Sequence, residues 1–157
     1  MAFCAGIDPG ATGGLAVVST DLREAHAWIY PGDVTLAAEL LREVWGEYRP
    51  DLFCLEHVRS MPKQGVASTF AFGRAFGLWE GLLAGLSIPW IYVTPQVWQR
   101  KLLDPGGKGT TKERSLSMAR RLFPGVDLKR KKDHGSADAL HLARYAIREL
   151  RGQRQAA

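Results

Sequence analysis

Short hydrophobic runs dominate the first third of the chain and recur between residues 50 and 95. Turn-forming Pro and Gly separate the first three runs, which lie at residues 3–8, 14–19 and 25–30. Such runs predict strands, here an antiparallel meander. A run at 51–56 is apolar up to its last residue, Glu56, which is typical of a central strand buried on both faces. A β-branched and aromatic run at 90–94 predicts a fifth strand.

Helical spacing of apolar residues fills the segments between and after these strands. Helices are predicted at residues 35–48, 67–86, 95–103, 112–122 and 136–150, with a Gly-rich loop at 104–111 and a basic loop at 128–132. This order predicts an α/β fold, a mixed five-stranded sheet with three antiparallel strands followed by parallel strands, flanked by helices. We expect a single domain over residues 1–151 and a frayed tail over 152–157.

The helix at 67–86 carries glycine at every fourth position, at Gly73, Gly77, Gly81 and Gly85. Each glycine costs about 1 kcal/mol against alanine in a helix interior, so a stripe of them suggests a compensating close approach by another element. The rest of this helix is almost entirely apolar and must be buried. Two explanations stay open: a twofold homodimer packed through this helix, or packing against the chain's own sheet.

Composition places the chain among ordinary globular proteins, with 46% hydrophobic and 24% charged residues in a length of 157. Its N-terminus lacks the pattern of a secretory signal, and Cys4 and Cys54 lie in strand-like runs. We therefore expect free thiols and a cytoplasmic location. The apolar segment 75–93 is interrupted by Glu80 and Pro89, which favours a helix, a turn and a strand over a membrane span.

Positive charge is concentrated in one stretch of the chain. Residues 100–132 contain 11 Lys and Arg against 3 Asp and Glu, whereas residues 1–99 contain 6 against 10. A local excess of this kind is typical of a surface that faces phosphate. A solvated basic face or a mobile loop explains the charge equally well.

Three acidic residues occupy the ends of predicted core elements: Asp8, Glu56 and Asp138. Carboxylates in such a group suit Mg²⁺ or Mn²⁺. Two ions about 4 Å apart stabilise both the attacking and the leaving oxygen in phosphodiester hydrolysis. The acids should also repel one another, so that without metal at least one has a raised pKa.

A fourth ligand is expected just before Asp138, where Asp133 and His134 precede the last helix. His134 lies about one helical turn from Asp138, and Asp133 could reach the same metal from the start of the helix. A carboxylate suits magnesium better than imidazole does, which favours Asp133 slightly. A capping role for Asp133 and an exposed loop position for His134 are the ordinary alternatives.

Five segments in order resemble the bacterial and phage RuvC-type Holliday-junction resolvases: GIDPGATGGLAVV, FCLEHVRSMPKQG, STFAFGRAFGLWEGLLAGL, VTPQVWQRKLL and KKDHGSADALHLARYAI. The resemblance implies an RNase H-like fold, a homodimer, and Mg²⁺-dependent paired nicks across four-way DNA. It implies two metal ions in each site, with Mn²⁺ able to substitute, and roles in DNA recombination and repair. For a phage-encoded chain, the expected location is the host cytoplasm.

The resemblance assigns the family's catalytic acids to Asp8, Glu56 and Asp138. The better-known bacterial pattern has Asp or His three residues before the last acid, and this chain has Gly135 there. Phage-like relatives are closer to the DHGSAD found here, which moves the fourth catalytic or metal-binding role to Asp133 or His134.

DNA-binding positions are also expected from the resemblance. The segment after the Glu56 strand, which probes the junction centre in the family, offers Met61, Lys63, Gln64 and Phe70, and Arg74 could contact phosphate. Among the basic residues of the next region, Lys112 matches the family's lysines most clearly, and Arg100, Lys101 and Lys108 are further candidates.

Three other functions fit part of the sequence. DPGATGG matches the Asp-x-Gly-x-Thr phosphate loop of sugar kinases and actin-like ATPases, but those proteins close two such domains around a nucleotide. A non-enzymatic basic DNA-binding protein explains the positive stretch and leaves the three acids unexplained. An RNase H-like nuclease acting on RNA–DNA hybrids or flaps shares the chemistry and differs only in substrate.

Overall fold

The computed structural model describes residues 1–58 and 65–156. Its five-stranded sheet has the order β3-β2-β1-β4-β5. The strands are β1 (Phe3–Asp8), β2 (Gly14–Ser19), β3 (Ala25–Ile29), β4 (Leu52–Glu56) and β5 (Trp90–Val93). β1, β2 and β3 pair antiparallel, and β4 runs parallel to both β1 and β5. The predicted mixed sheet is therefore confirmed, with its most apolar strands at the centre.

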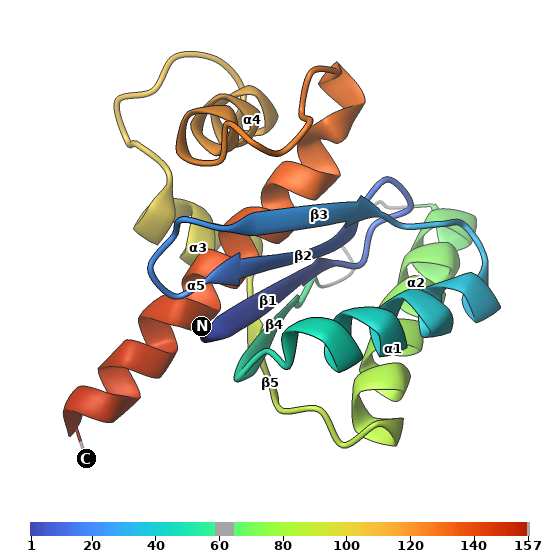
Figure 1. Cartoon of the computed structure of the whole chain (residues 1–157). Helices are drawn as coiled ribbons and strands as arrows, with labels where there is room; N and C mark the ends of the chain where they lie inside the picture. The colour runs from blue at the N-terminus through green and yellow to red at the C-terminus, as the bar shows by residue number, and fades with distance from the viewer. Residues whose placement is uncertain (59–64, 157) are drawn as a thin grey trace.

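Helices cover both faces of the sheet. They are α1 (Val34–Tyr48), α2 (Val66–Gly85), α3 (Pro95–Leu102), α4 (Thr111–Leu122) and α5 (His134–Ala156), with a 3-10 turn, η1 (Lys131–Asp133), before α5. Figure 1 shows α1 and α2 on one side and α3, α4 and α5 on the other. Each side has its own buried hydrophobic cluster against the sheet. The sheet is thus the middle layer of three.

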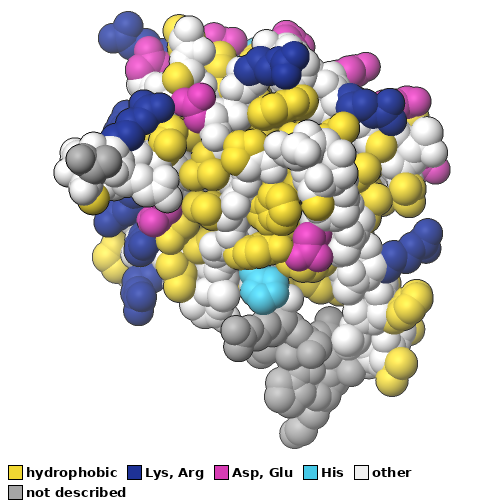
Figure 2. Space-filling model, turned by 90° about the horizontal axis from the view of Figure 1, so that it is seen from below, with side chains coloured by type: hydrophobic (Ala, Val, Ile, Leu, Met, Phe, Trp, Pro, Cys, Tyr) yellow, Lys and Arg dark blue, Asp and Glu magenta, His cyan; other side chains and the backbone are white. Residues whose placement is uncertain are grey.

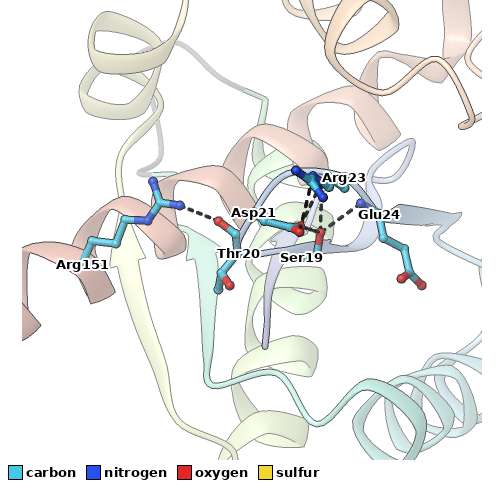
Figure 3. Close-up of polar contacts among 6 residues, drawn as sticks. All are labelled: Ser19, Thr20, Asp21, Arg23, Glu24 and Arg151. Carbon is cyan, nitrogen blue, oxygen red and sulfur yellow. Dashed lines mark hydrogen bonds and ion pairs between the residues drawn. The ribbon is translucent and has the colours of Figure 1, made fainter. Parts of the chain in front are cut away.

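α5 is longer than the sequence predicts at both ends. It begins at His134 and continues to Ala156, beyond the predicted end at residue 150. Two contacts hold its last turns. Arg151 donates to the Thr20 carbonyl in the β2–β3 turn, as Figure 3 shows, and Arg154 pairs with Asp51 at 3.3 Å. The spacing of apolar residues does not reveal contacts between distant parts of the chain, which is why the sequence predicts fraying there.

Two glycines let α5 lie unusually close to the strand that carries Asp8. A Cβ added to Gly6 in β1 would come within 2.1 Å of the Ala139 carbonyl oxygen of α5. A Cβ added to Gly135 in the first turn of α5 would come within 1.9 Å of the Thr12 carbonyl oxygen. Neither position accepts a side chain without backbone movement, so these glycines bring the start of α5 against the β1–β2 loop.

The apolar segment 75–93 forms the end of α2, a turn and β5, as predicted. Over residues 1–58 and 65–156, no helix is long and apolar enough to cross a membrane. Cys4 and Cys54 are both buried free thiols, which confirms the prediction made from their strand-like surroundings.

Candidate active site

The carboxyl ends of two neighbouring parallel strands bring Asp8 and Glu56 together. Ile7 of β1 is in register with Leu55 of β4, so the acids that follow them are neighbours at one edge of the sheet. Asp138 reaches the same edge from the first turns of α5. Each of the three acids interacts electrostatically with at least one of the others. The structure therefore assembles the group of acids that the sequence singles out.

Burial and mutual repulsion raise the pKa of these carboxyl groups. Burial, followed by the charge of Asp8, raises the pKa of Glu56 to about 8. Burial is again the largest cause for Asp138, whose pKa rises to about 7, with Asp8 adding to the effect. The pKa of Asp8 is also raised, chiefly by burial. The expectation of at least one raised pKa is confirmed, and the site resists holding three negative charges without a cation.

Each acid is held in place by a donor from a different element. Trp98 of α3 donates its indole N–H to Oε1 of Glu56 at 2.7 Å. Ser115 of α4 donates its hydroxyl to Oδ1 of Asp138. The backbone N–H of Gly10 donates to Oδ1 of Asp8 at 2.9 Å. Each of these hydrogen bonds uses one carboxylate oxygen, and the second oxygen of each acid has no hydrogen bond among the described residues.

Trp98, Ser115 and His141 are not among the site residues predicted from the sequence. His141 is fully buried. It contacts the Ser115 carbonyl oxygen at 2.9 Å and stacks on Trp98, with ring centroids 5.8 Å apart. One sequence signal was present, because His141 follows Asp138 by three residues and so shares its helical face.

Lys112 and His134 lie beside the acids. The charge of Lys112, in the first turn of α4, lowers the pKa of both Asp8 and Asp138, although burial dominates in each case. The charge of His134 lowers the pKa of Asp8 in the same way. Lys112 of α4 and His134 of α5 are thus near the acids.

Asp133 has a different environment from its neighbour His134. It is buried, accepts a hydrogen bond from the Arg130 backbone N–H at 2.8 Å, and pairs with the Arg130 guanidinium at 2.8 Å. Burial alone would raise its pKa, but these contacts hold the pKa below its usual value. This arrangement closes η1 and starts α5. The carboxylate of Asp133, which the sequence slightly favours as a fourth ligand, is thus engaged by Arg130, whereas His134 lies beside Asp8.

The predicted DNA-binding residues divide into three groups. Met61, Lys63 and Gln64 lie outside the described residues. Phe70 is 73% exposed near the start of α2, and Arg74, Arg100 and Lys108 are exposed. Lys101 is engaged within the protein: it donates to the Tyr145 hydroxyl at 3.2 Å and pairs with Glu149 at 3.3 Å. These contacts make Lys101 the weakest candidate of the set.

The glycine-bearing face of α2 does not pack against the chain's own sheet. A Cβ added at Gly73, Gly77, Gly81 or Gly85 would meet no atom within 4 Å. The opposite face of α2 contacts the core through Trp79 and Leu83, which are buried. Figure 2, which views the molecule from below Figure 1, shows hydrophobic side chains gathered in the middle of that face and Lys and Arg at its margins. Within one protomer, the stripe of glycines has no packing partner among the described residues.

No family model matches the chain. One curated relative, the chloroplastic Holliday junction resolvase MOC1 of Chlamydomonas reinhardtii, is 37% identical over 89 residues. The match covers 55% of this chain and 10% of the relative, so the chain spans about a tenth of the relative's length.

Two solved structures resemble most of the chain. RuvC of Thermus thermophilus in complex with a Holliday junction substrate has a TM-score of 0.65 and 24% identity, over 91% of this chain and 90% of the other. A second Thermus thermophilus RuvC structure has a TM-score of 0.63 and 25% identity, over 90% of each chain. The chain has the fold of RuvC. The expected RNase H-like α/β architecture is confirmed with it.

The acid group can be tested for its fit to a divalent cation. Among the described residues, no three His, Cys, Asp or Glu side chains are already arranged as a metal cluster. The chemistry of the acids nevertheless fits a hard cation, because all are oxygen donors and their pKa values are raised by burial and repulsion. Binding would require the uncommitted carboxylate oxygens to turn toward one centre.

Proposed function

We propose that this chain is a structure-selective DNA endonuclease that resolves four-way junctions by paired hydrolytic nicks. One observation carries the proposal: Asp8, Glu56 and Asp138 meet at the sheet edge, with Lys112 beside them. Sequence similarity to a Holliday junction resolvase and the RuvC fold support the choice of substrate.

The proposed cofactor is Mg²⁺, with two ions in each site and Mn²⁺ able to substitute. Asp8, Glu56 and Asp138 would hold the ions, with His134 as the fourth ligand. Divalent cations in such a site activate water and stabilise the leaving oxygen of the phosphodiester. The fit rests on the oxygen-rich donor set and on the repulsion that a cation would relieve.

The protein's own residues would orient the acids and the phosphate. Trp98 and Ser115 each hold one oxygen of Glu56 and of Asp138, which would leave the second oxygen of each acid available to a cation. Lys112 would place a positive charge beside the scissile phosphate and offset charge that develops there. Glu56 is buried, and Asp8 and Asp138 are partly buried, which limits screening of these interactions by bulk water.

We further propose a homodimer formed in part through α2. The open glycine stripe would let a second backbone approach closely, and the exposed Tyr92 of β5, 46% accessible, lies on the edge strand next to α2. Two copies related by a twofold axis would place two sets of acids on one four-way junction, as paired nicks require. Phe70, Arg74, Arg100 and Lys108 are the exposed residues proposed to contact the DNA.

The compartment remains a prediction. The buried free thiols of Cys4 and Cys54 are consistent with a reducing compartment such as the cytoplasm.

The test compares three substrates: a four-way DNA junction, a linear duplex of the same sequence, and an RNA–DNA hybrid. Each is incubated with the protein in Mg²⁺ and in EDTA. The proposal expects symmetric nicks in the junction alone, and only with Mg²⁺. Glu56→Gln serves as the inactive control, because it keeps the shape of the side chain and removes its charge.

Two results would redirect the proposal. Cleavage of the hybrid in preference to the junction would favour a different RNase H-like nuclease. Binding of the junction without cleavage in either Mg²⁺ or Mn²⁺ would favour a non-enzymatic DNA-binding protein.

A further inference from the structure

α4 contributes two side chains to the acid group from one helical face. Lys112 and Ser115 are three residues apart, so they lie one above the other on the helix. Lys112 acts on Asp8 and Asp138 by its charge, and Ser115 donates a hydrogen bond to Asp138. The same helix that would contact DNA therefore also touches one of the proposed metal ligands.

The side-chain hydroxyl and the backbone carbonyl of Ser115 both contact α5. Its hydroxyl donates to Oδ1 of Asp138, and its backbone carbonyl oxygen lies 2.9 Å from Nε2 of His141. Asp138 and His141 are on α5, so Ser115 joins α4 to α5 twice within one turn. Ser115 is fully buried, and a hydrogen bond in such surroundings holds its geometry more firmly than one exposed to water.

The contacts of His141 determine which ring nitrogen carries its proton. Arg144 approaches Nδ1 at 2.9 Å, and a guanidinium can only donate, so Nδ1 accepts. The Ser115 carbonyl can only accept, so Nε2 carries the proton and donates to it. A neutral ring in this single tautomer satisfies both partners. His141 also stacks on Trp98, whose indole N–H donates to Glu56.

One chain of contacts therefore runs from Asp138 to Glu56 through residues outside the acid group. It passes from Asp138 to Ser115, from Ser115 to His141, from His141 to Trp98, and from Trp98 to Glu56. Ser115, Trp98 and His141 are all fully buried. The carboxylates of α5 and β4 are thus held relative to each other by α3 and α4.

We propose that Ser115 and His141 are positioning residues that hold Asp138 and Glu56 beside each other, with one oxygen of each acid left free to bind a divalent cation. This rests on the proposed function only in naming those acids as metal ligands. Ser115 and His141 act through their neighbours and do not touch the cation. Removing a partner that orients a metal ligand typically weakens metal binding by about 10- to 100-fold.

The test is a direct titration of Mn²⁺ into the protein without DNA, followed by electron paramagnetic resonance of the free ion. Ser115→Ala is expected to weaken Mn²⁺ binding by about tenfold or more. Ser117→Ala, an exposed position on the same helix, is expected to leave it unchanged. Ser115→Thr keeps the hydroxyl and is expected to restore most of the affinity. Wild-type affinity in Ser115→Ala would overturn the proposal.

A second variant separates positioning from folding. Ser115→Cys keeps the size of the side chain and weakens only the donor, so it replaces Ser115→Ala if that variant does not fold. His141→Phe keeps a ring against Trp98 but removes the bond to the Ser115 carbonyl, and it should also weaken Mn²⁺ binding. Unchanged Mn²⁺ affinity in folded Ser115→Cys and His141→Phe would contradict the proposed role.

Cleavage kinetics provide an independent comparison on the same helix. Ser115→Ala is expected to lower kcat, to leave KM for the junction unchanged, and to regain rate at high Mg²⁺. Lys112→Ala is expected to raise KM and to lower kcat, and high Mg²⁺ should not restore its rate. Failure of the wild-type protein to cleave junctions would refute the proposed function, whereas the Mn²⁺ titrations would still decide the role of Ser115.

Discussion

The acid group and the glycine-bearing face of α2 differ in the contacts that each receives from its own chain. Asp8, Glu56 and Asp138 each have a hydrogen-bond donor from their own chain, supplied by Gly10, Trp98 and Ser115. The glycine stripe of α2 has nothing against it among the described residues of the same chain. In the proposed function, the chemistry of one cut would therefore belong to one protomer.

The pairing of two cuts would belong to the dimer. Glycines repeated on an exposed helical face lower helix stability without any gain inside the protomer. Their presence is explained if a second copy packs there. Variants of the acid group should therefore abolish chemistry and leave assembly intact, and variants of α2 should do the reverse.

The largest effect is expected from the acids. Glu56→Gln or Asp8→Asn should reduce the junction cleavage rate by roughly three orders of magnitude, which corresponds to about 4 kcal/mol in the activation barrier. Junction affinity in EDTA should not fall, because neither substitution adds a negative charge near the DNA. Glu39→Gln, an exposed carboxylate on α1, is the matched control and should retain the wild-type rate. Equal rates in Glu56→Gln and Glu39→Gln would remove Glu56 from the active site.

The next comparison is between His134 and Asp133. His134→Ala should weaken Mg²⁺ binding by about tenfold or more, as expected for loss of a ligand or its close neighbour. Asp133→Asn should chiefly lower the melting temperature, because it breaks the ion pair with Arg130 that closes η1. Calorimetric metal titration and thermal melting of both variants measure the two effects. A larger loss of metal affinity in Asp133→Asn would reverse the assignment.

The α2 face is tested by filling its glycine stripe. Gly77→Leu should weaken the dimer at least about tenfold, because a large side chain blocks the close approach of a second helix. The protomer should keep its fold, since nothing lies within 4 Å of a Cβ at this position. Gly46→Leu is the matched control, because Gly46 on α1 is equally open. Sedimentation gives the oligomeric state, and a wild-type dimer in Gly77→Leu would place the interface elsewhere.

A smaller effect is expected from Lys112 on DNA binding. Lys112→Ala should weaken junction binding and reduce the slope of log affinity against log salt by about 1, as the loss of one phosphate contact requires. Lys101→Ala should leave the slope unchanged, because Lys101 is held by Tyr145 and Glu149. Fluorescence anisotropy at several salt concentrations measures both slopes. Identical slopes for wild type and Lys112→Ala would remove Lys112 from the DNA interface.

The raised pKa values give the smallest predicted effect, on stability without metal. In the folded protein the pKa of Glu56 is about 8 and that of Asp138 about 7, so both bind protons that the unfolded chain has released. Stability should therefore fall as pH rises from 6.5 to 8.5. His141 does not interfere, because burial lowers its pKa to about 4 and it is neutral throughout this window.

The corresponding melting temperature in EDTA should drop by roughly a few degrees over that pH range. Glu56→Gln should lose most of this pH dependence, and saturating Mg²⁺ should reverse it in the wild type. A melting temperature that stays level or rises from pH 6.5 to 8.5 in EDTA would contradict the raised pKa values.

The sequence predicts the sheet and the three acids because both depend on local patterns. Apolar runs that end in Asp8 and Glu56 mark strand ends, and parallel neighbours place such ends side by side. The supports of the acids depend on contacts between helices far apart in the chain. Trp98 supports Glu56, and Ser115 supports Asp138. In each pair the two residues are on elements that no periodicity relates, so the pairing appears only in the folded structure.

The different surroundings of Asp133 and His134 also could not be predicted from the sequence. They depend on the 3-10 turn η1, which directs Asp133 toward Arg130 and leaves His134 at the first position of α5. Likewise, nothing local distinguishes Lys101, which pairs with α5, from Lys112, which lies beside the acids. Contacts that form only in the folded chain thus give different surroundings to residues that are adjacent or alike in the sequence.

The central claim is that Asp8, Glu56 and Asp138 together bind divalent cations. Anomalous diffraction from crystals grown with saturating Mn²⁺ tests it most directly. The account predicts Mn²⁺ between these three side chains, with carboxylate oxygens at about 2.1 Å, a distance close to that of Mg²⁺ ligands. Mn²⁺ bound only at other positions, with the three acids uncoordinated, would contradict it.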